Sequence, residues 1–325
     1  MSSVSLNSSA IKAQAQRLGF VACGLAKAEP VAENFARHYQ HWLELDYCGE
    51  MDYMRRNVEM RLNPDLLVPG VKTIVSLAMN FMPLQHQPAI SLYAQGLDYH
   101  DVMRKRMQEL MKTLQLEGRC FVDTAPVLER YWAWRSGIGI ITPEGGFISV
   151  PGYGPTVFLG ELFLLGEADH YGSPLHTPHL GECLNLAEQE NSDGNGALSP
   201  PRGGRSGTRA LCPALTPDGL DARLCISYQT IEHRGPLPDE MELKRTFYGC
   251  DRCLRATPQF AEAKPTDEPA FQPSEALLHM MPEDWQDLTE EQYKALFKGS
   301  AIKRAKFDGL KRNIERWLKR PNSSK

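Results

Sequence analysis

Four cysteines in the second half of the chain restrict its fold more than any other feature. They are Cys212, Cys225 and the pair Cys250 and Cys253, which has C-x-x-C spacing. This spacing lets two sulfurs on one turn reach the same inorganic centre, and four thiolates suit an iron–sulfur cluster or zinc. The sequence therefore predicts one metal centre held by these four sulfurs. Four ordinary reduced cysteines are the other interpretation.

Two prolines indicate how many centres to expect. Pro213 follows Cys212, as proline follows the remote ligand of ferredoxin-like folds with two clusters. The position before Pro258, where a second cysteine of this kind would stand, holds Thr257. Because the remote ligand serves the other cluster, Thr257 removes a ligand from a second cluster and leaves the first set intact. We therefore expect one [4Fe–4S] cluster, with a four-cysteine zinc site as the alternative.

Composition and the N-terminal segment indicate the compartment. The chain has 325 residues, a net charge of -4 and eight cysteines, so it is not a basic protein overall. The N-terminal segment lacks a basic start followed by an apolar core, and no apolar run is long enough to span a membrane. We expect a cytoplasmic protein without membrane contact, in which cysteines bind metal rather than form disulfides. Cys23, Cys48 and Cys120 are expected to be structural, and Cys183 is left unassigned.

Hydrophobic periodicity predicts alternating helices and strands, which favours an α/β layer architecture through about residue 170. Residues 187–209 are rich in Gly, Ser, Pro and Asn and have no apolar period, which is typical of a flexible insert. Helices are expected within 8–45, interrupted at 19–30, and at 98–118, 289–299 and 309–320. Strands are expected at 71–83, at the start of 119–130 and at 156–166. The apolar stripe of the helix at 98–118 is interpreted as core packing.

Many segments, in collinear order, resemble the epoxyqueuosine reductases of tRNA modification. They include "GEMDYMRRN", "NPDLLVPGVKTIVSLAMNFMP", "YAQGLDYHDVMRKRM", "FVDTAPVLER", "FLGEL", "DARLCISYQTIE", "YGCDRC" and "GSAIKRAKFDGLKRN". The resemblance covers most of the chain. It implies an α/β (α+β) cobalamin-binding domain at 1–170 and a degenerate ferredoxin-like iron–sulfur module at 171–260. A short helical tail at 261–325 follows.

The resemblance also implies an activity and partners. Family members use cobalamin and two [4Fe–4S] clusters, and they reduce the epoxide of epoxyqueuosine in tRNA to queuosine. For this chain we therefore expect cobalamin, one [4Fe–4S] cluster, tRNA as substrate and an electron donor such as flavodoxin or ferredoxin. We expect a monomer. The alternatives are a repurposed relative that keeps one iron–sulfur or zinc site without reducing tRNA, and a corrinoid reductase of another small substrate.

The resemblance assigns a proton donor, Asp123 in "VDTAP". Opening an epoxide releases an oxygen that needs a proton, and a carboxylic acid in a partly dry pocket has a raised pKa suited to that task. On residue chemistry alone, Asp123 is equally well explained as a turn or helix-capping residue.

The segment similar to the family's "YA-x-G-x-DYH" supplies candidate pocket residues. They are Tyr93, Asp98, Tyr99 and His100. His100 need not bind cobalt, because a lone histidine is more often held by hydrogen bonds.

Two departures from the family pattern affect the expected site. The family's leading C-x-x-C-x-x-C is replaced by the Gly/Ser/Pro-rich stretch, which leaves Cys183 alone in that region and supports a single cluster. A glycine–lysine pair of the family, with a tryptophan ahead of it, is replaced by residues that include Ile140, Thr142 and Pro143.

The C-terminal segment is basic. Its cations could neutralise tRNA phosphates or form a solvated helix face. These residues are Lys303, Arg304, Lys306, Lys311 and Arg312.

Overall fold

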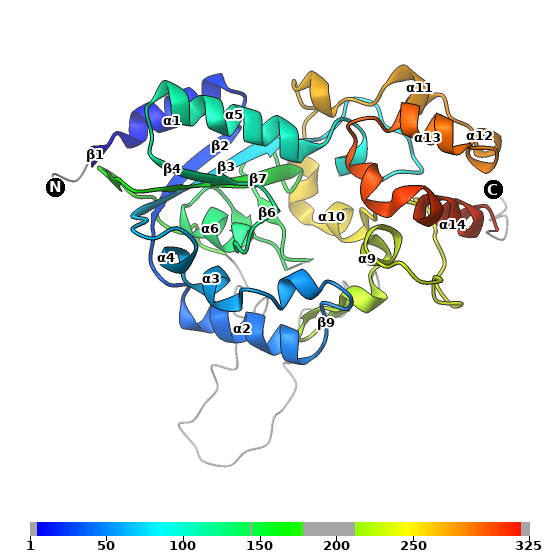
Figure 1. Ribbon diagram of the computed structural model, residues 1–325, viewed down its shortest axis with the longest axis horizontal. Helices are drawn as coiled ribbons and strands as arrows, with labels where there is room; N and C mark the ends of the chain where they lie inside the picture. The colour runs from blue at the N-terminus through cyan, green and yellow to red at the C-terminus, as the bar shows by residue number, and fades with distance from the viewer. Residues whose placement is uncertain (1–4, 144, 178–211, 320–325) are drawn as a thin grey trace, which may run out of the picture.

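A four-stranded antiparallel sheet forms the centre of the N-terminal part of the protein. The computed structural model describes residues 5–143, 145–177 and 212–319. The strand order is β2–β3–β7–β4 (Figure 1). Strands β3 (Thr73–Asn80) and β7 (Val157–Leu164) pair along their whole lengths, and β2 and β4 pair with their outer edges. The fold is therefore mixed α/β, with its main sheet antiparallel.

Most other elements of the described chain are short. The remaining strands are β1 (Ser5–Leu6), β2 (Ala22–Lys27), β4 (Gly118–Phe121), β5 (Ile140–Ile141), β6 (Ile148–Ser149), β8 (Glu167–Ala168), β9 (Leu215–Thr216) and β10 (Gly219–Leu220). The α-helices are α1 (Ser8–Arg17), α2 (Glu33–Glu44), α3 (Val58–Leu62), α4 (Pro64–Leu67), α5 (Tyr99–Thr113), α6 (Glu129–Arg135), α9 (Ile226–Ile231), α10 (Arg252–Ala256), α11 (Glu275–Leu278), α12 (Pro282–Gln286), α13 (Glu290–Leu296) and α14 (Lys306–Leu318). The 3₁₀ turns are η1 (Asp52–Met54), η2 (Leu92–Ala94), η3 (Ala222–Leu224), η4 (Pro258–Glu262), η5 (Pro269–Phe271) and η6 (Ala301–Ala305).

The longer predicted elements are confirmed. The apolar runs at 71–83 and 156–166 contain β3 and β7, and the amphipathic stretch at 98–118 contains α5. The segment 19–30, expected only to interrupt helices, forms strand β2. Its short apolar stretch takes this conformation because it pairs with β3 along its whole length.

Helices cover both faces of the sheet (Figure 1). On one face, Met103, Met107 and Leu110 of α5 pack with α1 against Leu77 and Leu162 of the sheet. The stripe of α5 is therefore core packing, as predicted. On the other face, the residues of α6 form a second core with the opposite side of the same strands. Because both faces are covered, every residue of β3 is buried.

A third core holds the C-terminal helices together. Trp285, Phe297 and Ile314 pack in it with residues from the segment 89–94. That segment comes from the N-terminal half, and its Ile90 forms a β-bridge with Tyr248. The division into parts ending at 170 and 260 stays a prediction, and this packing joins the first part to the last.

Two predictions concern features of the chain as a whole. The insert at 187–209 and Cys183 lie outside the described residues. Among the residues that the structure describes, none of the helices has the length and apolar character needed to cross a membrane.

Strand β7 offers a test of the core. We expect Leu162→Ala to lower the free energy of unfolding by about 2–5 kcal/mol, because Leu162 is 0% exposed and its removal leaves a cavity. Leu165→Ala is the matched control, since Leu165 follows the same strand and is 42% exposed. Urea unfolding followed by circular dichroism measures both. Equal losses in the two variants would contradict this assignment of the core.

Candidate active site

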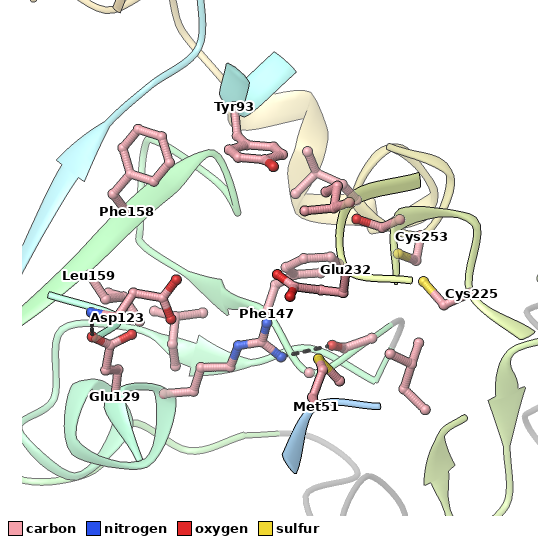
Figure 2. A pocket seen from close by; sticks show the side chains of 18 of the residues that line it. Met51, Tyr93, Asp123, Glu129, Phe147, Phe158, Leu159, Cys225, Glu232 and Cys253 are labelled. Carbon is pink, nitrogen blue, oxygen red and sulfur yellow. Dashed lines mark hydrogen bonds between the residues drawn. The ribbon is translucent and has the colours of Figure 1, made fainter. Parts of the chain in front are cut away.

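A cavity of about 1680 Å³ lies between the sheet and the C-terminal helices (Figure 2). Ligand pockets in proteins commonly measure about 300–1000 Å³, so this one suits a large cofactor together with a substrate. It brings together all the site residues predicted from the sequence. These lining residues are Tyr93, Asp98, Tyr99, His100, Asp123, Cys212, Cys225, Cys250 and Cys253.

The start of helix α5 delivers three of these residues. Asp98 is the N-cap, and its Oδ1 accepts a hydrogen bond from the backbone N–H of His100 at 3.1 Å. The same oxygen lies 2.6 Å from Nδ1 of His100. The Tyr99 ring stacks on Phe158 of β7, with centroids 4.1 Å apart. The helix cap and this stacking therefore fix both rings at the cavity wall.

Asp123 reaches the same place from the loop after β4. Its φ of 50° is in the left-handed region, which few residues other than glycine adopt. Its Oδ2 accepts a hydrogen bond from the Tyr99 hydroxyl at 2.6 Å and lies 3.6 Å from Nε2 of His100. The carboxylate is 59% exposed, so it faces the open cavity while remaining in contact with α5.

The pKa of Asp123 differs from the expectation. Partial loss of hydration beside the cavity wall raises it, but hydrogen bonds from His100 and Tyr99, together with the charge of His100, lower the pKa below its ordinary value. Burial lowers the pKa of His100, but contacts with Asp123 and Asp98 outweigh this and raise it to about 9. The expectation of a raised pKa for Asp123 was therefore wrong. At neutral pH the pair carries its one proton on His100.

Two glutamates beside Asp123 were not predicted from the sequence. Glu129, the first residue of α6, accepts a hydrogen bond at Oε1 from the backbone N–H of Asp123 at 2.6 Å (Figure 2). Burial, and next the charge of Asp123, raise the pKa of Glu129 to about 8. Glu161 of β7 is 0% exposed, and burial raises its pKa well above the ordinary value.

The opposite wall of the cavity comes from the C-terminal part. The Tyr93 hydroxyl donates to the Tyr248 hydroxyl at 3.4 Å, and Tyr248 in turn donates to the Ala301 carbonyl at 2.9 Å. Glu232, which lines the cavity, binds Arg304 at 2.8 Å. These contacts tie the wall to the turn η6.

The four predicted cysteines meet at one end of the cavity. Cys212 precedes β9, Cys225 is the N-cap residue of α9, and Cys250 and Cys253 flank the start of α10. Figure 2 shows Cys225 and Cys253 at this end. Burial, and next the charges of Cys225, Cys250 and Cys212, raise the pKa of the Cys253 thiol to about 12. Since these sulfurs act on one another electrostatically, they would remain thiols unless a cationic centre stabilised their thiolates.

Among the residues that the structure describes, no group of three or more Cys, His, Asp or Glu side chains forms a ready-made metal site. The four cysteines line one cavity, and their role as metal ligands stays a prediction.

Neighbouring residues hold the C-x-x-C segment in place. Asp251 accepts hydrogen bonds from the Ser91 hydroxyl and, at 3.0 Å, from the Leu92 backbone N–H. Thr257 is 2% exposed, and its hydroxyl donates to the Cys253 carbonyl at 3.1 Å. Thr257 therefore serves as the C-cap of α10, and its hydroxyl is occupied within that helix.

The segment 140–143, which departs from the family pattern, lies beside the four cysteines. Strands β5 and β6 form a hairpin in which Thr142 is fully buried and bonds to Phe147. At the hairpin tip, Gly145 has a φ of 116°, and a Cβ added there would lie 3.5 Å from the Cys253 sulfur. The hairpin therefore lines the cavity and also contacts the cysteine site.

Comparisons with known proteins identify the family. The model of the family "Epoxyqueuosine reductase QueG, DUF1730" matches residues 61–124. The epoxyqueuosine reductase of Cellulophaga algicola is 35% identical over 323 residues, which are 95% of this chain and 97% of the relative. The chain belongs to the epoxyqueuosine reductase family. The Pseudomonas aeruginosa epoxyqueuosine reductase is 33% identical, over 94% of this chain and 82% of its own length.

A solved structure has the same fold. It is an epoxyqueuosine reductase crystallised with an epoxyqueuosine-modified tRNA-Tyr stem loop. It is 22% identical and has a TM-score of 0.76, and the match covers 95% of this chain and 80% of that one.

The basic residues of this family member divide into two groups. Lys311 donates to the Leu288 carbonyl at 3.3 Å, and Arg312 donates to the carbonyls of Gln229 and His233 at 2.8 and 3.1 Å. These two cations therefore brace the C-terminal core. Lys303 and Arg304 line the cavity instead.

The charge on His100 can be tested by titration. We expect its imidazole to titrate near pH 9 by NMR, and Asp123→Asn to move its pKa toward the ordinary value because a stabilising carboxylate is lost. Stability from this group is complete below the ordinary histidine pKa and disappears as the pH rises through about 9. The exposed Asp267→Asn is the control and should leave the titration unchanged. An unchanged midpoint in Asp123→Asn would refute the pairing.

Proposed function

We propose that this protein reduces the epoxide of epoxyqueuosine in tRNA to queuosine. The observation that carries this proposal is the cavity of about 1680 Å³, in which Asp123 and the four cysteines face one space within a chain that belongs to the reductase family over nearly its whole length. The named relatives are epoxyqueuosine reductases, and one of them was crystallised with a modified tRNA stem loop. We propose a cytoplasmic monomer.

The cavity suits cobalamin. Its volume exceeds that of common pockets, and its wall includes the broad apolar side chains of Phe147, Phe158 and Leu159 (Figure 2). Tyr93, Asp98 and Tyr99 would line the bound corrinoid. When bound, the cofactor supplies a low-valent cobalt for reduction of the epoxide.

The cysteine site suits one [4Fe–4S] cluster. Cys212, Cys225, Cys250 and Cys253 supply the four thiolates that such a cluster uses. The cluster supplies electrons, which an external donor of the flavodoxin or ferredoxin class would provide. Thr257 is consistent with a single cluster, because its hydroxyl is engaged in capping α10.

The chain's own residues supply the proton that the released oxygen needs. Cleaving a carbon–oxygen bond of the epoxide leaves an alkoxide that needs a proton. The Asp123–His100 pair holds one proton, and the Tyr99 hydroxyl donates to Asp123 and orients its carboxylate. Asp123 is the more exposed member of the pair and transfers the proton, while His100 is the group that stores it at neutral pH.

Lys303 and Arg304 are the proposed phosphate contacts. Both line the cavity, and a few clustered cations are enough to neutralise part of a nucleic-acid backbone. Arg304 is already paired with Glu232, so its guanidinium is fixed in orientation.

The reaction provides the decisive experiment. Protein purified without oxygen and loaded with cobalamin is given a one-electron reductant and tRNA containing epoxyqueuosine, and nucleosides are measured by mass spectrometry. We expect queuosine from the wild type and a loss of about 10²–10⁴-fold in kcat for Asp123→Asn, because the general acid is removed. Asp267→Asn is the matched control. Wild-type protein that binds cobalamin but leaves the epoxide intact would refute this function.

Metal analysis tests the cluster. We expect about four irons and four sulfides per chain after anaerobic purification, with the absorbance of a [4Fe–4S] cluster. Cys225→Ser and Cys253→Ser should lose most of the iron, whereas Cys48→Ser should retain it, since Cys48 is buried outside the cavity lining. One zinc per chain without iron would contradict the proposal and support the zinc alternative.

A further inference from the structure

The overall chemistry of the proposed reduction requires more protons than Asp123 can hold. An epoxide accepts two electrons and two protons to give an alkene and water. Two carbon–oxygen bonds break, the carbon–carbon double bond forms, and the oxygen leaves with two new O–H bonds. The low-potential one-electron donor of the flavodoxin or ferredoxin class supplies the electrons. The Asp123–His100 pair carries one proton, so a second proton must reach the pair during each turnover, either from water or from a neighbouring group.

Glu129 is next to the pair on the side away from α5. Its Oε1 accepts the Asp123 backbone N–H at 2.6 Å, which also holds Asp123 at its unusual φ of 50° (Figure 2). Glu129 therefore positions the residue that reaches the substrate. The side chain lines the same cavity.

Glu161 lies deeper, on the sheet face that α6 covers. In the register of the sheet it is opposite Ser76 of β3 and Phe121 of β4, two residues before Asp123. Across the described residues, neither its two carboxyl oxygens nor the Ser76 hydroxyl has a hydrogen-bond partner. A fully buried carboxylate without a partner is very costly, so this side chain is a neutral acid.

The charges around Glu129 and Glu161 favour the protonated forms of both side chains. The groups that act on Glu129 are the Asp123 carboxylate, which raises its pKa, and the cations of Arg130 and His100, which lower it. The groups that act on Glu161 are Glu129 and Asp123, and both raise its pKa. Carboxyl groups gathered in this way cannot all ionise at neutral pH.

We propose that Glu129 and Glu161 form an internal proton reserve that recharges the Asp123–His100 pair within each turnover. This inference rests on the proposed function. Glu129 is the near member, since it contacts Asp123, and Glu161 is the deeper member, on which the charges of Glu129 and Asp123 act. Both are positioning residues, because neither is the group that projects toward substrate.

The first test needs no activity. Infrared difference spectra detect the carbonyl stretch of a protonated carboxylic acid, which a carboxylate lacks. In the full-length protein we expect one such band to disappear as the pH rises through about 8 and to be missing in Glu129→Gln. A second band should persist to higher pH and be missing in Glu161→Gln. Glu167→Gln, at an exposed position on β8, is the control and should keep both bands. Absence of both bands from the wild type at pH 7 would overturn the proposal.

The second test uses the pH profile of the reduction. Glutamine at 129 keeps an oxygen to accept the Asp123 N–H but cannot carry a transferable proton, so Asp123 stays in position. We expect Glu129→Gln to lower kcat about 10- to 100-fold, less than loss of the acid itself, with KM for tRNA unchanged. The decline of wild-type kcat as the pH rises through about 8 should be absent in this variant. Glu129→Asp, which keeps a carboxyl group, should restore part of the activity and the decline.

Two outcomes separate this inference from the proposed function. If the wild type does not form queuosine yet shows both infrared bands, the proposed function is refuted. The protonated state of Glu129 and Glu161 is then still confirmed. If the wild type forms queuosine and Glu129→Gln has the same kcat and pH profile, the function stands and the reserve is refuted. Should Glu161→Gln fail to fold, Glu129→Gln alone decides between these outcomes.

Discussion

The pairing of β7 with its neighbours is the constraint on which the site depends. One register sets three positions at once. Phe158 of β7 receives the ring of Tyr99, Phe121 of β4 pairs with Glu161, and Asp123 follows Phe121 by two residues. A shift of one residue would turn every side chain of the strand to the opposite face. Asp123 would then lose its position relative to α5, and Glu161 would move to the α5 side of the sheet.

The cavity brings a group of acids and a group of cysteines to one space. The acids come from the sheet, α5 and the start of α6, whereas the cysteines come from residues 212–253, which run from just before β9 into the first turn of α10. The segment 89–94 joins them, because it packs in the C-terminal core and its Ser91 binds Asp251 between two of the cysteines. Gly249, with a φ of 71°, permits this approach, since a Cβ there would lie 2.5 Å from the Ser91 Cβ. The acids and the cysteines are thus held together by packing and by the Ser91–Asp251 contact.

Residue patterns predicted the longer elements and the residues that line the cavity, but not the protonation of its carboxyl groups. The long apolar runs specified β3 and β7, and the collinear motifs led to Asp123, His100 and the four cysteines. The pKa of Asp123 could not be read from the sequence, because it depends on contacts with α5 that form only in the fold. The sequence indicated Glu161 in one way only. It is the lone acid within the apolar run "FLGELFLL", where a charge is costly unless it is neutralised. The residue pattern around Lys311 did not indicate its partners, because a basic helix face has the same pattern whether it contacts phosphate or carbonyl groups.

Two positions that depart from the family pattern, the segment 140–143 and Thr257, both lie close to Cys253. Thr142 anchors the β5–β6 hairpin through Phe147, and the hairpin tip at Gly145 lies against Cys253. Thr257 caps the helix that carries Cys253. Thr257 and the segment 140–143 therefore both contribute to the surroundings of the same sulfur. His100 and Arg130 are cations that act on the acids at the cavity wall. In the proposed reaction, the second proton would consequently come from Glu129 and Glu161 rather than from a lysine of the β5–β6 hairpin.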